Sequence, residues 1–281
     1  MKSSVRLRWA TLLVAVSLIL GAGLPSARAA DRIVRTEAGA VKITEVARGL
    51  ENPWSLAFLP DGRMLVTERP GRLRIVSPDG RVSAPVSGVP EVHARGQGGL
   101  LDVVLSPTFA SDRTVFLSYA QPAGGGARTA VARARLDAEA LRLDEVEVIF
   151  AQKDSPPGSH HWGSRLVFGR DGNLFVTLGD RFHHRDRAQD LDSHLGKIVR
   201  IRPDGSVPDD NPLVNRAGAL PEIWSYGHRN VQGATLHPAS GELWTHEHGP
   251  QGGDEVNRTL AGRNYGWPVI TYGREYAGPG I

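Results

Sequence analysis

Residues 159–181 read SHHWGSRLVFGRDGNLFVTLGDR. Two apolar runs, 165–168 and 174–178, flank the tetrapeptide Gly169-Arg170-Asp171-Gly172. An Asp-Gly pair between apolar runs is typical of a β-hairpin, because both residues tolerate the backbone angles of a tight turn. The pattern therefore predicts two short antiparallel strands here.

Polar residues gather at the open end of this predicted hairpin. His160 and His161 precede the first strand, and Asp180 and Arg181 follow the second. Antiparallel strands bring entry and exit to one edge, so an imidazole and a carboxylate could meet there. A histidine held by a carboxylate is the basic unit of general-base catalysis. The alternative is a solvated histidine pair beside an ordinary turn.

The same strand–turn–strand unit recurs along the chain. Its copies cover residues 52–76, 98–120, 164–178 and 232–244. They begin roughly fifty to seventy residues apart, which suggests four-stranded blades with insertions. The sequence thus predicts an all-β fold, a β-propeller with about four blades. Residues 130–143 could form a helix, but their alternation also suits a strand.

Both ends of the chain bear on closure of such a ring. Residues 41–46 suggest a lone strand, one half of a closure. No closing strand is apparent between the NYGWP segment, 264–268, and the end of the sequence at Gly278-Pro279-Gly280-Ile281. We therefore expect a chain that is incomplete at its C-terminus. A genuine four-bladed ring is the alternative.

The first 29 residues have the features of a secretory signal peptide. Lys2, Arg6 and Arg8 precede the apolar residues 10–20, and Ala27-Arg28-Ala29 suits cleavage after Ala29. This predicts a propeller domain over residues 30–281, a periplasmic or secreted location, and no stable membrane insertion after cleavage. The alternative is an uncleaved membrane anchor.

Charge and cysteine content narrow the function classes. The formal net charge is +3, and removing the leader with its four basic residues leaves −1. The basic balance of the whole chain therefore gives no reason to expect nucleic-acid binding. The sequence has no cysteine, so stability must come from the core and from any bound metal.

Three further motifs lie next to predicted blade strands. Gln97 stands in the glycine-rich run RGQGG, and Arg229 and Asn230 stand in YGHRN. A guanidinium beside an amide suits a ligand with carbonyl or carboxylate oxygens, although an Arg paired to a blade carboxylate is equally compatible.

Residues 247–255 read EHGPQGGDE. Backbone carbonyls freed by glycine and proline, together with carboxylates, are the oxygen ligands that Ca²⁺ takes. His246 and His248 lie two apart and could share a strand face, which leaves a transition-metal site as an alternative.

Taken together, the motifs resemble the soluble pyrroloquinoline-quinone-dependent aldose sugar dehydrogenases, relatives of soluble quinoprotein glucose dehydrogenase and the glucose/sorbosone dehydrogenases. The matching segments run in the family's order across nearly the whole mature chain: NPW 52–54, QGGL 97–100, HWGSR 161–165, LGD 178–180, GHRN 227–230, EHGP 247–250, GDE 253–255 and NYGWP 264–268. The resemblance implies a six-bladed β-propeller, of which about four blades are present here.

The resemblance also implies residue roles. His161 matches the family's general base, Asp180 the carboxylate that orients it, and Gln97 a side chain at the quinone and substrate. Arg229 and Asn230 match the pair at the quinone carbonyls, so Arg229 would also stabilise developing negative charge. Tyr276 matches another residue that contacts the cofactor. Gly249 and Pro250 match the residues whose carbonyls hold the active-site Ca²⁺. Glu255 and Tyr265 match residues of a second, structural calcium site.

The implied reaction is oxidation of an aldose at its anomeric carbon to an aldonolactone, with an external electron acceptor. The family's cofactor-binding Lys and Arg residues from later blades have no counterpart here, so we expect this 281-residue chain to be inactive by itself. Two other functions remain open: a Ca²⁺-dependent propeller lactonase and a non-catalytic sugar-binding propeller.

Overall fold

The computed structural model describes residues 31–276, and the predicted signal peptide lies outside them. The chain divides into two compact units, residues 1–45 and 46–281. In the first unit, β1 (Arg32–Thr36) pairs with β2 (Gly39–Ile43). The predicted lone strand at 41–46 was therefore wrong. Residues 37–38 form the tight turn between them, and Gly39, the first residue of β2, has a φ of +131° that favours glycine.

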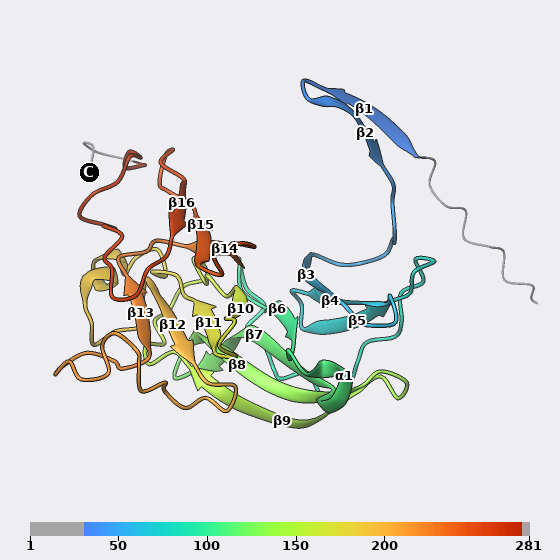
Figure 1. Ribbon diagram of the computed structural model, residues 1–281, viewed down its shortest axis with the longest axis horizontal. Coiled ribbons are helices and arrows are strands. Elements are labelled where there is room, and N and C mark those ends of the chain that lie inside the picture. Colours follow the sequence, from blue (N-terminus) through green and yellow to red (C-terminus); the bar gives the residue numbers. More distant parts are fainter. Residues whose placement is uncertain (1–30, 277–281) are drawn as a thin grey trace, which may run out of the picture. The chain divides into compact units, whose positions relative to one another are not determined.

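The second unit consists of four antiparallel sheets that follow one another along the chain (Figure 1). The first sheet holds β3 (Pro53–Phe58), β4 (Met64–Glu68) and β5 (Arg72–Val76). The second holds β6 (Leu100–Leu105), β7 (Thr114–Ala123), β8 (Gly126–Asp137) and β9 (Arg142–Ala151), with the short helix α1 (Phe109–Asp112) between β6 and β7.

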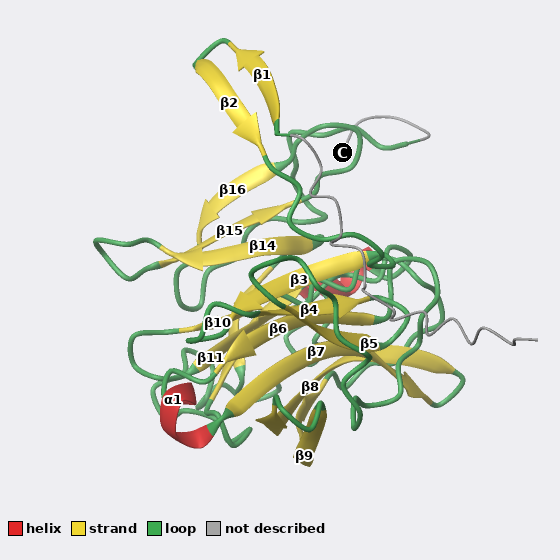
Figure 2. Ribbon diagram, turned by 90° about the vertical axis from the view of Figure 1, so that its right-hand side faces the viewer, coloured by secondary structure: helices red, strands yellow, loops and turns green. Residues whose placement is uncertain are grey.

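The third sheet holds β10 (Leu166–Phe168), β11 (Leu174–Thr177), β12 (Lys197–Ile201) and β13 (Ile223–Tyr226). A 3₁₀ turn, η1 (Arg185–Gln189), lies between β11 and β12. The fourth holds β14 (Val231–Leu236), β15 (Leu243–Glu247) and β16 (Glu255–Arg258), which Figure 2 shows as neighbouring strands.

The predicted strand pairs are confirmed in all four repeats, and residues 130–143 form the end of β8, a turn and the start of β9 rather than a helix. The architecture is all-β and propeller-like. The prediction of four strands in every repeat was wrong for the first and fourth sheets, which have three strands each. Among the described residues, no helix is long and apolar enough to cross a membrane.

The core consists of layers between successive sheets. Leu117 of β7 packs with Leu65 and Leu73 of the first sheet, whereas its neighbour Phe116 packs with Leu174 of the third. Adjacent strand residues face opposite sides, so one strand contributes to two apolar layers. A further layer joins the third and fourth sheets through Phe175, Ile198, Val231 and Leu243.

A repeated buried hydroxyl links each sheet to the next. The Oγ1 of Thr67 donates to the Leu101 carbonyl at 2.6 Å, the Oγ of Ser118 to Ser164 at 2.6 Å, and the Oγ1 of Thr177 to Val231 at 2.8 Å. Each hydroxyl also accepts a backbone N–H from within, or directly before, the first strand of its own sheet, as Thr177 does from Arg165 at 2.9 Å. These bonds fix the first strands of neighbouring sheets relative to one another.

Candidate active site

The predicted general base lies at the open end of the β10–β11 hairpin. The Nδ1 of His161 lies 2.7 Å from the Oδ1 of Asp180, and both side chains are buried. A carboxylate beside Nδ1 favours the tautomer in which Nδ1 carries the proton, so Nε2 is left to accept one. His161 and Asp180 both line a cavity of about 260 Å³. The predicted meeting of imidazole and carboxylate is thus confirmed.

Both oxygens of Asp180 have protein donors. Oδ1 also accepts the backbone N–H of Phe182 at 2.8 Å, and Oδ2 accepts the indole N–H of Trp267 at 2.7 Å. Three donors from three different positions fix the plane of this carboxylate. The plane of the His161 ring is fixed in turn.

Strained backbone is concentrated at this corner. His161, Ser164, Arg181 and Phe182 have φ values of 52°, 82°, 59° and 63°. Such left-handed angles are unfavourable for residues with a bulky side chain, at a cost of about 1–3 kcal/mol each, and they persist only where the surroundings enforce them. The segments on both sides of the His161–Asp180 pair are therefore held in place by their contacts.

Arg229 brings a buried positive charge to the same cavity. Its Nη1 donates to the His248 carbonyl at 3.1 Å, and its Nη2 lies 3.4 Å from the hydroxyl of Tyr276. Within residues 31–276, no carboxylate lies at ion-pair distance from this guanidinium, although it is only 4% exposed. A buried, unneutralised cation facing a cavity is suited to an anionic ligand.

Two other predicted cofactor residues contact the backbone around His161 and do not line this cavity. The Oε1 of Gln97 accepts the His161 N–H at 2.8 Å, and the Oδ1 of Asn230 accepts the Gly163 N–H at 3.1 Å. Tyr276, by contrast, lines the cavity and is 55% exposed.

The predicted metal residues divide between two hollows. Pro250 lines the cavity that holds His161, whereas Gly249, Glu255 and Tyr265 line a second hollow with room for about 10 Å³, one ion or one water. The carbonyl oxygens of Gly249 and Pro250 accept no hydrogen bond from any described residue. Free carbonyls of this kind fit a hard cation.

Two carboxylates, Glu247 and Glu255, face the small hollow. Burial, with the nearby charge of Glu247, raises the pKa of the Glu255 carboxyl. The Tyr265 hydroxyl is already used, since it donates to the Arg258 carbonyl at 2.6 Å and accepts the Leu260 N–H at 2.7 Å. Tyr265 could thus offer a metal only its backbone carbonyl.

The transition-metal alternative finds no support in the described part of the chain. Residues 31–276 contain no group of three or more His, Asp or Glu side chains placed to hold a metal.

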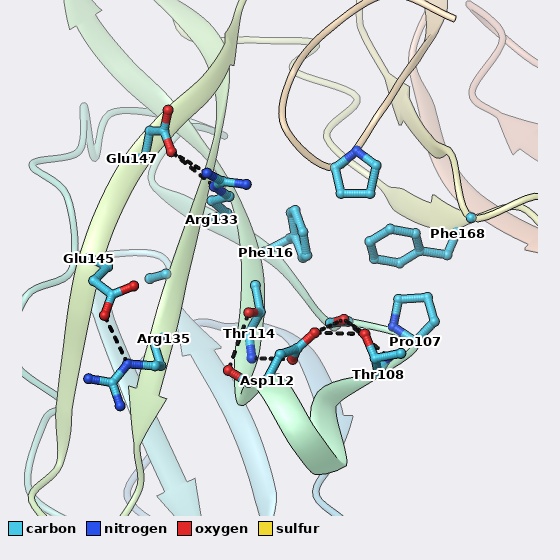
Figure 3. Close-up of a pocket in the computed structure, with 14 residues that line it drawn as sticks. Pro107, Thr108, Asp112, Thr114, Phe116, Arg133, Arg135, Glu145, Glu147 and Phe168 are labelled. Carbon is cyan, nitrogen blue, oxygen red and sulfur yellow. Dashed lines mark hydrogen bonds and ion pairs between the residues drawn. The ribbon is translucent and has the colours of Figure 1, made fainter.

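A larger hollow of about 690 Å³ contains none of the predicted site residues (Figure 3). Two ion pairs belong to its lining, Arg133 with Glu147 at 2.9 Å and Arg135 with Glu145 at 3.2 Å. The Asp112 carboxylate, which also lines it, accepts hydrogen bonds from neighbouring hydroxyls and from the Thr114 N–H. Each of these charged groups thus already has a protein partner.

Sequence reasoning missed three residues of the site. The first is Trp267, which donates a hydrogen bond to Asp180. The second is Phe182, which packs edge-to-face on His161 with ring centres 5.2 Å apart. The third is Glu247, whose carboxylate accepts the backbone N–H of Arg229 at 2.6 Å and lies 2.8 Å from the Nδ1 of His228. Trp267 stands in the NYGWP segment, which was recognised without assigning a role to its tryptophan. Phe182 follows Asp180 without any sequence signal of its own.

Comparisons with known proteins identify the family of the chain. Residues 50–281 match the family model described as Glucose / Sorbosone dehydrogenase. The aldose sugar dehydrogenase YliI of Escherichia coli K12 is 49% identical over 231 residues, which cover 82% of this chain and 62% of that protein. The chain thus covers about three fifths of the length of this protein and of a second curated relative.

Two solved structures extend the similarity to the fold. A glucose dehydrogenase crystal structure is 51% identical with a TM-score of 0.82, covering 85% of this chain and 69% of that one. The PQQ-bound aldose sugar dehydrogenase of Streptomyces coelicolor is 33% identical with a TM-score of 0.69, covering 92% of this chain and 71% of that one. On the extent of the family match and these relatives, the chain belongs to the glucose/sorbosone dehydrogenase family.

Proposed function

We propose that this chain serves the oxidation of aldose sugars at the anomeric carbon to aldonolactones, with pyrroloquinoline quinone and Ca²⁺ as cofactors. The observation that carries the proposal is the His161–Asp180 pair, which lines the same cavity as an unneutralised Arg229. A base and a cation facing one small space suit removal of a proton from a hydroxyl while negative charge develops nearby.

The residues of the chain handle the proton. Nε2 of His161 takes the proton of the anomeric hydroxyl as the C–H bond breaks and the C=O bond of the lactone forms. Asp180 stabilises the imidazolium that results, because its Oδ1 lies 2.7 Å from Nδ1. Trp267 keeps that carboxylate in place through its indole N–H.

When bound, pyrroloquinoline quinone supplies a two-electron acceptor for the hydride and Ca²⁺ supplies a Lewis acid. The residues present fit both groups. Arg229 would hold an anionic cofactor, with Tyr276 beside it, and the carbonyls of Gly249 and Pro250 would hold the metal. Glu255 and Tyr265 belong to the proposed second calcium site, and Gln97 and Asn230 support the loop of the base.

Two parts of the proposal extend past the described residues. The chain covers 62% of its E. coli relative, so we propose that turnover needs a longer form of the protein. We also propose export to the periplasm or beyond, guided by residues 1–29, and electron transfer to an external acceptor.

A reconstitution assay tests the proposal. The chain is stripped of metal with a chelator, and pyrroloquinoline quinone is added with and without Ca²⁺. Reduction of an artificial dye by glucose and other aldoses is then measured, in parallel with a form extended at its C-terminus. The expected result is dye reduction that needs both additions in the extended form, and no dye reduction by the 281-residue chain. A folded, extended form that reduces no dye with any aldose would contradict the proposal.

A further inference from the structure

Arg181 is a buried cation that the proposed chemistry does not use. It directly follows Asp180 and is only 1% exposed. Burial lowers the pKa of its guanidinium to about 10, and the charge of Asp180 offsets part of this effect. Within residues 31–276, no carboxylate lies at ion-pair distance from it. Burying a charge costs free energy, and a salt bridge usually offsets part of that cost. Since Arg181 has no such partner among these residues, the other contacts of its guanidinium should indicate its role.

The guanidinium bonds three backbone carbonyls and stacks on one ring. Nε donates to His160 at 3.1 Å, Nη1 to Ala127 at 2.8 Å and Nη2 to Gly158 at 2.7 Å. Its central carbon lies 3.4 Å from the ring centre of Trp162. Two of the three carbonyls, and the ring, belong to the segment 158–162 that carries His161.

We propose that Arg181 is a positioning residue that holds His161 in its left-handed conformation and so keeps the imidazole against Asp180. The reason is geometric. Arg181 contacts the chain on both sides of His161, because it donates to the His160 carbonyl and stacks on the Trp162 ring. Without these contacts, the strained residue at φ 52° could relax toward a common backbone conformation and turn its imidazole away from Asp180.

Arginine suits this task better than lysine. Its planar fork offers several donors in fixed directions and a flat face for stacking, whereas an ammonium group offers one compact point of charge. Arg181→Lys therefore keeps the charge but cannot bond all three carbonyls and stack on Trp162 at the same time. This makes it an informative variant even if Arg181→Gln fails to fold.

Arg200 provides the matched control. It is also a buried arginine near a tryptophan, 5.2 Å from the ring of Trp224, but it bonds the carboxylates of Asp171 at 2.6 Å and Asp210 at 2.9 Å. Arg200→Lys should cost stability without disturbing the His161 segment. A merely structural role for Arg181 would give the same result in both arginine variants.

The first readout is amide hydrogen exchange in the 281-residue chain, without cofactor or substrate. The His161 and Gly163 amides are bonded to Gln97 and Asn230, and should be protected in the parent chain. We expect their exchange to accelerate at least about tenfold in Arg181→Lys and Arg181→Gln, and to stay unchanged in Arg200→Lys. The Val176 amide, within the β11 ladder, should not respond in any variant. Unchanged exchange at His161 and Gly163 in a folded Arg181 variant would overturn the proposal.

The second readout is turnover, and this part rests on the proposed function. In a preparation that reduces dye, Arg181→Lys should lower kcat about tenfold and change KM less than twofold. Arg200→Lys should keep kcat within twofold. Equal losses in the two variants would contradict a positioning role for Arg181. If no preparation oxidises any sugar, the proposed function fails, whereas the exchange result still decides whether Arg181 holds the loop.

Discussion

Around His161 the polar groups of the chain satisfy one another, whereas around Pro250 several do not. In the base half of the site, defined as His161, Asp180, Arg181 and Trp267, the Asp180 carboxylate accepts three hydrogen bonds and the Arg181 guanidinium donates three. In the ligand half, defined as Arg229, Glu247, Gly249, Pro250 and Glu255, the buried guanidinium has no ion-pair partner among the described residues, two carbonyls accept no hydrogen bond from those residues, and two carboxylates share a hollow with the guanidinium.

This difference separates positioning from binding. Buried polar groups are normally paired, so a paired cluster needs no ligand and serves as a rigid support. Groups left without partners mark where a ligand supplies the missing charge or donor. The predictions that follow probe each half, from the largest expected effect to the smallest.

Replacing the base should have the largest effect. His161→Asn removes the proton acceptor, so dye reduction should fall about a thousandfold. The thermal midpoint and calcium binding should change little, because the ligand half is untouched. His246→Asn, on β15 and lining neither hollow, is the control and should keep full activity. Activity of His161→Asn within tenfold of the parent would show that another group takes the proton.

Breaking the hydroxyl bond that joins the third and fourth sheets should affect stability next. Thr177→Val removes a buried hydroxyl and leaves the Val231 carbonyl and the Arg165 N–H without partners. The free energy of unfolding, measured with urea, should fall by about 2 kcal/mol.

Thr245→Val is the matched control for this change. The Oγ1 of Thr245 lies 2.9 Å from another hydroxyl, that of Thr259, which can turn to other partners. Its loss should cost less than half as much. Equal losses at Thr177 and Thr245 would show that the bond between the sheets contributes nothing special.

Removing one hydrogen bond to the Asp180 carboxylate should reduce turnover less than replacing His161 does. Trp267→Phe keeps an aromatic ring in the cavity but removes the donor to Asp180 Oδ2, so kcat should fall about tenfold. Trp224→Phe, which loses a 3.3 Å bond to the Thr259 carbonyl away from the cavity, should leave kcat within twofold. A normal kcat in Trp267→Phe would mean that two donors suffice to hold Asp180.

Lys197 should produce the smallest effect, visible as a dependence on pH. Its ammonium group donates to the carbonyls of Arg187, Ala188 and Leu195, which holds η1 beside the cavity. Burial lowers the pKa of Lys197 from 10.5 to about 7. Between these values the unfolded chain binds more protons than the folded one, so this residue makes stability rise with pH.

The matching experiment compares the parent with Lys197→Met by urea unfolding at pH 7 and pH 8. The stability of the parent should rise by about 1 kcal/mol more than that of the variant. Identical pH dependences would mean that Lys197 keeps its ordinary pKa, with the three carbonyls offsetting burial.

Much of this arrangement could be predicted from the sequence because it depends on local patterns. The Gly169–Gly172 turn predicts the hairpin, and the hairpin brings His161 to Asp180. Contacts that cross between sheets have no such pattern, which is why Trp267, 87 residues from Asp180, received no role. That the first and fourth sheets end after three strands was also not predicted, because the repeated strand–turn–strand pattern does not show how many strands each sheet contains.

Gln97 and Asn230 illustrate a subtler limit. Their motifs correctly predict proximity to the site, but a motif does not say which atoms a side chain meets. In the structure both amide oxygens accept backbone N–H groups of the His161 segment. Whether a side chain is satisfied by the protein or left for a ligand depends on packing, and only the fold reveals it.

Calcium binding to the chelator-treated 281-residue chain tests the central claim most directly, since every residue of the ligand half lies within it. Isothermal titration should show saturable binding that Glu255→Gln weakens at least about tenfold. Glu242, a partly exposed acid just before β15 that pairs with Arg258 and lines neither hollow, provides the control, and Glu242→Gln should bind as the parent does. Absence of any binding heat in the folded parent, or equal binding by Glu255→Gln, would contradict the claim that these unsatisfied groups form a metal site.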